Sequence, residues 1–218
     1  MEKGRFITVE GIEGVGKSTN VGFICERIGA AGYGVVSTRE PGGTPLAEDI
    51  RDVVLAERAE PVPAAAELLL MFAARAVHLE NLILPALERG DWVVCDRFTD
   101  ATLAYQGHGR GQDTGRIRQL ADIVHPGLWP DLTLLLDAPL PVSRQRSRDR
   151  GITDRFENEQ GAFFERVRAG YLALAEAEPE RYAVVDASRP LQSVQKEIGL
   201  HIDRLMAEKR DWIGDRSL

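Results

Sequence analysis

The stretch Gly11-Ile-Glu-Gly-Val-Gly-Lys-Ser18 decides the fold of this chain of 218 residues, because it fits the phosphate-binding pattern G-x-x-x-x-G-K-[ST]. A short β-branched run at residues 5–9 precedes it, and a helical pattern over about 17–30 follows it. In that context the glycines let backbone N–H groups face a phosphate, and the positive end of the helix adds to the attraction. Lys17 would reach the β- and γ-phosphates, and Ser18 would hold Mg²⁺. The alternative is a structural glycine turn capped by Ser18.

Short apolar strands alternate with helical patterns along the rest of the chain. The runs at 91–95 and 132–136 are almost continuously apolar, as expected where helices cover both faces of a sheet. Further strands are expected at 34–38 and 182–185, and further helices at 45–56, 64–88, 141–150, 160–177 and 191–209, with a bend near Pro85. This order predicts an α/β fold of the P-loop NTPase type. We expect one domain, 1–218, with a doubly wound parallel β-sheet of about five strands, flanked by helices and binding ligands at the carboxyl ends of the strands.

The composition excludes several classes of partner. Twenty-seven Lys plus Arg against 34 Asp plus Glu leave a net charge of −7, which argues against a protein that coats nucleic acid. The longest uncharged run, 28–38, is too short to span a bilayer, and the first residues lack a signal-peptide core, so we expect a cytoplasmic protein without a membrane partner. The isolated Cys25 and Cys95 are expected to be buried free thiols rather than disulfide or zinc ligands.

Carboxylates at the ends of strands and the absence of a guanine-binding motif narrow the class of P-loop protein. Asp96 ends an apolar strand, where a residue that organises metal or water belongs; the alternative is the N-cap of the next helix. Asp137 ends a strand similarly but is followed by Ala138-Pro139, which makes it a weaker candidate. The guanine-reading tetrapeptide N-K-x-D is absent, which excludes a GTPase, and a nucleic-acid translocase would be longer and more basic. A small phosphate acceptor fits better.

Five arginines lie within the twelve residues 144–155 of this acidic chain. Such a cluster repels itself unless anions bind there. Gly151 interrupts the run, which indicates a lid over about 144–157 that brings guanidinium groups to transferring phosphates. The alternative is a solvated helix face, since arginines two residues apart point in different directions around a helix.

The whole chain resembles the bacterial thymidylate kinase family. The resemblance rests on an ordered set of motifs: the P-loop, Thr38-Arg-Glu-Pro-Gly-Gly-Thr44, Asp96-Arg97-Phe98, Ala104-Tyr-Gln-Gly107 and Asp154-Arg-Phe-Glu157. It implies Mg²⁺-dependent transfer of the γ-phosphate of ATP to dTMP, giving dTDP and ADP for dTTP biosynthesis, in a homodimer. A kinase of another nucleotide or of a deoxynucleoside, and an ATP-binding protein without catalysis, remain as alternatives.

The resemblance also implies roles for the acceptor residues. Asp96 and Arg97 would flank the acceptor phosphate, and Glu13 would reach the 3′-hydroxyl of the sugar. Phe72 would stack on the base and Arg75 would bind the thymine edge from the same helix face, although Phe72 could equally be a core aromatic. Tyr171 would lie near C2′ and disfavour a ribose, or would simply be core. The full acceptor set expected is Glu13, Arg39, Pro41, Phe72, Arg75, Arg97, Thr102, Tyr105, Gln106 and Tyr171.

The donor and catalytic sets follow from the same motifs. In the family that the chain resembles, some members carry an arginine inside the P-loop and others supply it from the lid. Residues 12–15 contain none, so the resemblance implies that the lid supplies it: Arg150, with Arg148 and Arg155 in support. The catalytic set expected is Lys17, Asp96, Arg97, Arg150 and Arg155, with Ser18 and Asp96 as metal ligands. The donor set expected is Gly11, Ile12, Glu13, Gly14, Val15, Gly16, Lys17, Ser18, Thr19, Arg146, Arg148 and Ala187. His108 stands where related loops often have glycine, and we expect it to be an exposed loop residue.

Overall fold

The computed structural model of the chain describes residues 3–150 and 161–208. Within them, five strands form one sheet in the order β2-β3-β1-β4-β5, with every neighbouring pair parallel. The strands are β1 (Phe6–Glu10), β2 (Val35–Arg39), β3 (Trp92–Asp96), β4 (Leu132–Asp137) and β5 (Tyr182–Asp186). The doubly wound parallel sheet predicted from the alternation of elements is therefore confirmed.

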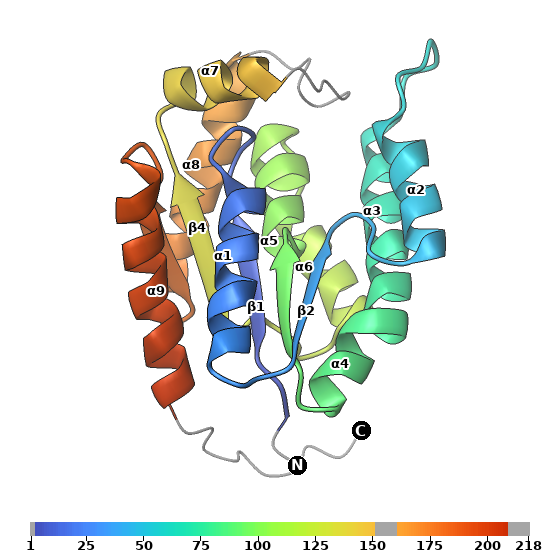
Figure 1. Cartoon of the computed structure of the whole chain (residues 1–218). Helices are drawn as coiled ribbons and strands as arrows, with labels where there is room; N and C mark the ends of the chain where they lie inside the picture. The colour runs from blue at the N-terminus through green and yellow to red at the C-terminus, as the bar shows by residue number, and fades with distance from the viewer. Residues whose placement is uncertain (1–2, 151–160, 209–218) are drawn as a thin grey trace.

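Helices cover both faces of the sheet. In Figure 1, α1 (Lys17–Ala30) and α9 (Leu191–Ala207) lie on the near face, and α8 (Gly161–Ala177) lies behind it. The other helices are α2 (Pro45–Leu55), α3 (Ala64–His78), α4 (Leu84–Glu88), α5 (Thr99–Thr102), α6 (Thr114–Val124) and α7 (Leu140–Arg150). The arrowheads of the strands point toward the edge at which α7 crosses the molecule (Figure 1). Ligands are expected at that edge.

Two π-helical segments occur in the described residues. The first lies within the predicted helix 64–88, and the second continues the short helix α5. The predicted helix 64–88 consists of α3, the π segment η1 (Leu79–Ile83) and α4. Pro85 has no N–H to donate within α4, and the wider π turn precedes it instead of a simple bend at the helix end. The π segment η2 (Leu103–Gly109) continues α5. It holds His108 exposed in a helical turn rather than in a loop.

The helical run Ala64–Glu88 is long and apolar enough, by length and composition alone, to cross a membrane. Core helices meet the same criterion. This run packs against α2 and α6, and its charged Glu67 and Arg75 are both buried against other parts of the protein. Those contacts place one side of the run against the rest of the protein, while Leu69 of the same helix is 58% exposed.

Candidate active site

The P-loop turns between β1 and α1 with backbone conformations that need glycine. Gly14 has φ +76°, and a Cβ there would lie 2.0 Å from the carbonyl oxygen of Ser143 at the start of α7. Gly16, with φ +90°, is the N-cap of α1 and makes no side-chain capping bond. Ser18 lies inside the first turn and is exposed, so the alternative of a turn capped by Ser18 is wrong.

Lys17 folds back over this loop. Its Nζ donates to the carbonyl oxygens of Ile12 at 2.9 Å and Gly11 at 3.2 Å. Burial, and next the positive charge of Arg97, lower the pKa of Lys17 to about 8, while Asp96 and Glu13 oppose the shift. An anionic phosphate in the loop would replace the carbonyl oxygens as acceptor and favour the charged amine.

Arg97 joins the P-loop to the end of β3. Its Nη2 forms an ion pair with Glu13 at 2.8 Å, and its Nη1 donates to the Gly11 carbonyl oxygen at 2.9 Å. The hydroxyl of Tyr105 donates to Glu13 at 2.7 Å and lies 3.0 Å from Arg97 Nη2. The Tyr171 hydroxyl accepts from Arg97 Nη1 at 3.1 Å. Four of the expected site residues, Glu13, Arg97, Tyr105 and Tyr171, therefore meet in one cluster.

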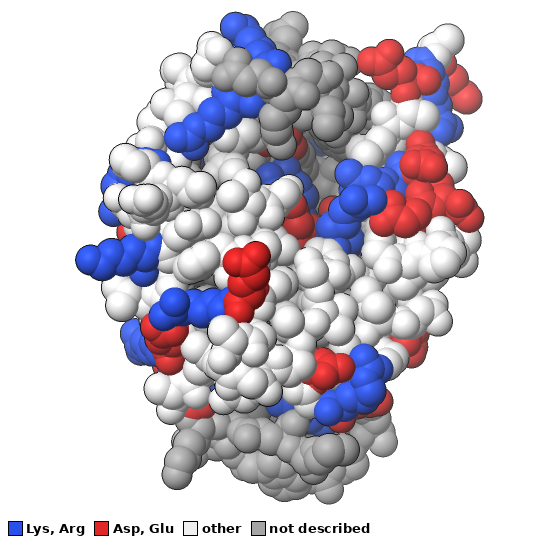
Figure 2. Space-filling model, in the orientation of Figure 1, with Lys and Arg blue, Asp and Glu red and all other residues white. Residues whose placement is uncertain are grey.

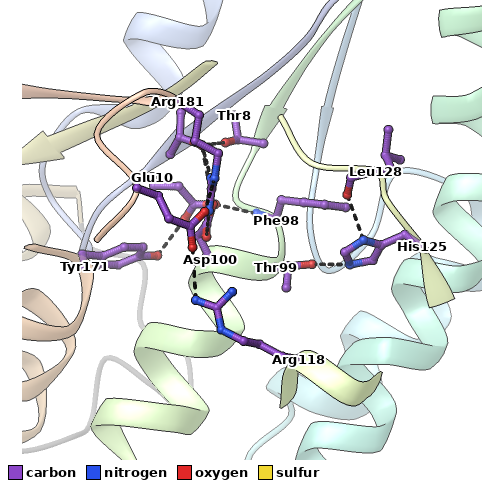
Figure 3. A network of polar contacts seen from close by, with 12 residues as sticks. Thr8, Glu10, Phe98, Thr99, Asp100, Arg118, His125, Leu128, Tyr171 and Arg181 are labelled. Atoms are coloured by element: carbon purple, nitrogen blue, oxygen red, sulfur yellow. Dashed lines mark hydrogen bonds and ion pairs between the residues drawn. The ribbon is translucent and has the colours of Figure 1, made fainter. Parts of the chain in front are cut away.

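A buried carboxylate that the sequence analysis does not single out, Glu10, contacts this cluster through Tyr171 (Figure 3). Glu10 accepts from the Tyr171 hydroxyl at 2.8 Å and from the Phe98 N–H at 2.7 Å. Burial, and next the negative charge of Asp100, raise the pKa of Glu10 to about 8. Its place between an apolar strand and the P-loop is a sequence signal that could have identified it.

A pocket opens beside the Arg97 cluster. It is lined by Glu13, Glu40, Pro41, Arg51, Leu55, Met71, Arg97, Ala101, Tyr105 and Gln106. Arg51 Nη1 donates to the Pro41 carbonyl oxygen at 2.7 Å. Glu40 and Arg51 line the pocket but are not among the expected site residues. Glu40 lies within the motif at residues 38–44, between Arg39 and Pro41, which is a signal that could have identified it. No local pattern marks Arg51, because α2 brings it to the pocket only through the fold.

Two residues of the expected acceptor set each have a polar atom that is buried without a hydrogen-bond partner among the described residues: Arg75 Nη1 and Gln106 Oε1. The other nitrogens of Arg75 are engaged, Nε with Glu40 at 2.7 Å and Nη2 with Thr102 Oγ1 at 3.0 Å. Buried polar atoms are rarely left unpaired in folded proteins. One unpaired donor and one unpaired acceptor among these residues are compatible with a ligand that offers the complementary pair.

Asp96 and Ser18 line a second hollow together with Thr38 and Arg39. Helix α5 begins at Thr99 with Phe98 at its N-cap, so Asp96 does not cap it, contrary to the alternative. Figure 2 shows that this face is hollowed in its upper half and that basic and acidic atoms occur together there, without a broad basic surface. Arg39 itself forms an ion pair with Glu48 at 2.9 Å.

Phe72 lies in the core, 3% exposed, with the Arg75 guanidinium 4.8 Å from its ring centroid. The residue of α3 that lines the pocket is its neighbour Met71. The stacking role predicted for Phe72 remains a prediction. What the structure does place on the ring is the guanidinium of Arg75, which holds that side chain in position.

Two residues of the expected donor set, Arg146 and Ala187, are in contact, and the segment expected to form a lid is described in part. Arg146 Nη1 donates to the Ala187 carbonyl oxygen at 2.7 Å, which joins α7 to the turn after β5. Arg148 lies exposed on α7. Arg155 and the side chain of Arg150 lie outside the described residues. Asp137 accepts two hydrogen bonds from Arg168, from Nε at 2.6 Å and from Nη2 at 2.7 Å.

Comparisons with known proteins agree on one family. Residues 9–198 match the family model described as thymidylate kinase. A thymidylate kinase of Chromohalobacter salexigens is 59% identical over 209 residues, which cover 95% of this chain and 99% of that protein. A thymidylate kinase of Methylococcus capsulatus is 58% identical over 207 residues, with the same coverage of 95% and 99%.

A solved structure agrees with these relatives. The crystal structure of thymidylate kinase from Ehrlichia chaffeensis superposes with a TM-score of 0.73 at 32% identity and covers 94% of this chain and 99% of that chain.

Proposed function

The chain belongs to the thymidylate kinase family, and we propose that its P-loop and the Arg97 cluster together transfer the γ-phosphate of ATP to dTMP, giving dTDP and ADP for dTTP biosynthesis. It is a phosphotransferase of the nucleoside monophosphate kinase class. The observation that supports the assignment best is the ion pair between Glu13 and Arg97, because it places a P-loop residue in contact with the motif that would hold the acceptor phosphate.

In this mechanism an oxygen of the dTMP phosphate attacks the γ-phosphorus in line. The bond from that phosphorus to the β–γ bridging oxygen breaks, and ADP leaves with the electron pair. The attacking oxygen is already ionised at neutral pH, so no residue has to remove a proton. Arg97 holds the acceptor phosphate, Glu13 accepts a hydrogen bond from the sugar, and Lys17 and the lid arginines balance charge on the transferring group.

Ser18 and Asp96 fit a magnesium ion. Both line one hollow, both offer oxygen donors, and Mg²⁺ in kinase sites takes only one or two protein oxygens besides phosphates and water. When bound, the ion supplies charge neutralisation to the phosphates. Asp96 then acts by orienting the ion, a water or Arg97.

The unpaired atoms of Arg75 and Gln106 support a pyrimidine acceptor. A guanidinium can only donate, and an amide oxygen can only accept. Thymine offers the matching pair at one edge, the O4 acceptor beside the N3–H donor. Arg75 would bind O4 and Gln106 Oε1 would bind N3–H, while Thr102 holds Arg75 in place.

Of the remaining assignments, the homodimer rests on the resemblance to the family, and the location and the absence of other partners rest on charge and composition. In this proposal the protein is a cytoplasmic homodimer without a nucleic-acid or membrane partner. Three exposed apolar side chains on neighbouring helices support a dimer face: Leu46 on α2, Leu69 on α3 and Ile123 on α6, exposed by 55%, 58% and 75%. Helix α3 packs against both α2 and α6.

A panel of acceptors tests the proposed function. ADP release measured with ATP, Mg²⁺ and dTMP, dUMP, CMP, AMP or thymidine is expected to be fastest with dTMP. Lys17→Met should abolish it, whereas the matched variant Lys196→Met, on the exposed face of α9, should not. If thymidine reacted faster than dTMP, the assignment of Arg97 to the acceptor phosphate would be wrong. Absence of turnover with every acceptor would favour a non-catalytic ATP-binding protein.

A further inference from the structure

Glu67 is a charged residue in the interior that the reaction itself does not use. It lies on α3 with its side chain 1% exposed. Its Oε1 accepts from Gln106 Nε2 at 2.9 Å and forms an ion pair with Arg110 Nε at 3.2 Å. A buried carboxylate is stable only when it is paired and hydrogen-bonded, and here both requirements are met from η2 and the residue that follows it.

The chemistry of this contact fixes which end of the Gln106 amide faces Glu67 and which end is left without a partner. A carboxylate has acceptors only, so the amide must turn its NH₂ group toward Glu67. Its carbonyl oxygen Oε1 then lies on the opposite side, where it is buried and has no partner among the described residues. Gln106 is one of the residues that line the acceptor pocket.

We propose that Glu67, held by Arg110, is a specificity-determining residue: it locks the Gln106 amide so that the pocket selects a base with an N–H donor at position 3. This inference rests on the proposed function, because it takes the base to lie beside Gln106. Thymine and uracil carry N3–H beside the O4 acceptor. Cytosine has the reverse pattern, an unprotonated N3 beside an amino group, so the oxygen of Gln106 and the unpaired Nη1 of Arg75 would each face a group of their own kind.

Without the lock, the selection weakens. A neutral amide in place of Glu67 offers either its oxygen or its NH₂ group, so Gln106 can turn over and present Nε2 to the base. Sites built to hydrogen-bond a substrate group reject an analogue without that group strongly, because buried polar atoms are then left unpaired. The loss of selection should therefore appear between bases that differ at positions 3 and 4, and not between bases that differ at the 5-methyl group.

Glu67→Gln tests the proposal with two ratios of kcat/KM. The ratio for dUMP over dCMP isolates the base edge, because both lack the 5-methyl group, and we expect it to fall at least tenfold. The ratio for dTMP over dUMP should stay within twofold. Glu80→Gln, an exposed carboxylate of the same helical run, is the matched control and should change neither ratio. A purely structural role for Glu67 would lower kcat/KM for all acceptors alike, and equal loss would overturn the proposal.

A second variant covers the case in which Glu67→Gln does not fold. Arg110→Gln acts at a side chain that is 23% exposed and removes the charge that holds Glu67. We expect a smaller fall in the dUMP over dCMP ratio, and calorimetric binding of dUMP and dCMP without ATP should show the same direction. An unchanged ratio in a folded Arg110→Gln protein contradicts the lock. Failure of the wild-type protein to prefer dTMP would instead contradict the proposed function, so the two failures are distinguishable.

Discussion

At the scale of single residues, Arg97 shows why a forked cation stands at the centre of the site. One guanidinium reaches the carbonyl oxygen of Gly11, the carboxylate of Glu13 and the hydroxyls of Tyr105 and Tyr171. The point charge of a lysine could not hold four oxygens in fixed directions. The backbone of Arg97 has φ +73°, a conformation that costs a non-glycine residue about 1–2 kcal/mol. The backbone N–H of Arg97 donates to the Val9 carbonyl oxygen, and the backbone N–H of Phe98 donates to the Glu10 carboxylate. These two hydrogen bonds hold that turn in place.

Buried His125 makes the free energy of unfolding depend on pH. Its Nδ1 donates to the Leu128 carbonyl oxygen at 2.9 Å and its Nε2 accepts from the Thr99 hydroxyl at 2.7 Å (Figure 3). Burial, and next the charge of Arg75, lower the pKa of His125 from 6.5 to about 4. The unfolded chain therefore binds a proton at higher pH than the folded protein does. As the pH falls from 6.5 to 4, this imidazole lowers the free energy of unfolding by up to about 1.4 kcal/mol per pH unit.

His125→Gln should remove that dependence, because an amide does not titrate in this range. Urea unfolding from pH 4 to 7.5 is expected to show the stability advantage of the wild type over this variant shrinking as the pH falls below 6.5. Glu10→Gln should show the opposite direction: the folded pKa of Glu10 is about 8 against 4.5 in the unfolded chain, so its ionisation lowers wild-type stability as the pH rises through that range. A pH-independent difference between the wild type and His125→Gln would refute the assignment.

The residues of the site divide into those that the sequence predicts and those that it does not. Lys17, Asp96, Arg97 and Glu13 lie in motifs whose spacing fixes their places at the ends of β1 and β3, so they could be named in advance. Glu67 could not, because its meaning depends on a partner 39 positions away in η2. The unpaired atoms of Arg75 and Gln106 could not be predicted for the same reason. Which atom stays unpaired depends on the hydrogen bonds that the other atoms of each side chain make in the folded protein.

At the scale of elements, the strands were the most predictable parts. Their runs are short, rich in apolar or β-branched residues, and each ends at a charged residue. Each predicted strand lies within one residue of the observed one at both ends. Helix α6 was not predicted, although Asp113 caps it and accepts from the Gly115 N–H. The π segments were not predicted either. Their wider hydrogen bonding fits the packing of η2 on α8, where a Cβ at Gly170 would lie 2.6 Å from His108.

Helix α7 and the segment beyond it carry the arginines proposed to form a lid, and Arg150→Ala tests their role. A guanidinium that stabilises charge on a transferring phosphoryl group contributes three to five powers of ten to the rate. We therefore expect kcat to fall about a thousandfold or more, with little change in the KM for dTMP, in steady-state kinetics. Arg116→Ala, at a side chain that is 82% exposed on α6, is the control and should leave kcat unchanged. A fall of less than about tenfold would contradict the lid assignment.

At the scale of the whole molecule, the exposed leucine of α3 predicts the state of assembly. If the face formed by α2, α3 and α6 joins two copies, a charge at Leu69 should separate them. Sedimentation velocity at micromolar concentration should show a dimer for the wild type and a monomer for Leu69→Glu. Leu200→Glu, at a leucine 63% exposed on α9, is matched in residue type and exposure and should remain dimeric. A monomeric wild type would contradict the proposed dimer.

The net charge of −7 is compatible with two anionic substrates because the cations of the site are local. Lys17, Arg75 and Arg97 converge near the carboxyl ends of β1 and β3, while acidic residues dominate the rest of the count. At physiological salt the field of an exposed charge is screened within about 8 Å, so a nucleotide in the hollow is governed by the nearby cations rather than by the total.

We expect the ion pair between Glu13 and Arg97 to couple the binding of the two substrates thermodynamically. Glu13 belongs to the loop that would hold one nucleotide, and Arg97 belongs to the motif that would hold the other. A shift of either side chain would therefore change the contacts of the other side chain. Such a bridge makes the affinities of the two substrates interdependent. By linkage, any factor by which donor occupancy changes the acceptor's dissociation constant must reappear, unchanged in size, when the order of addition is reversed.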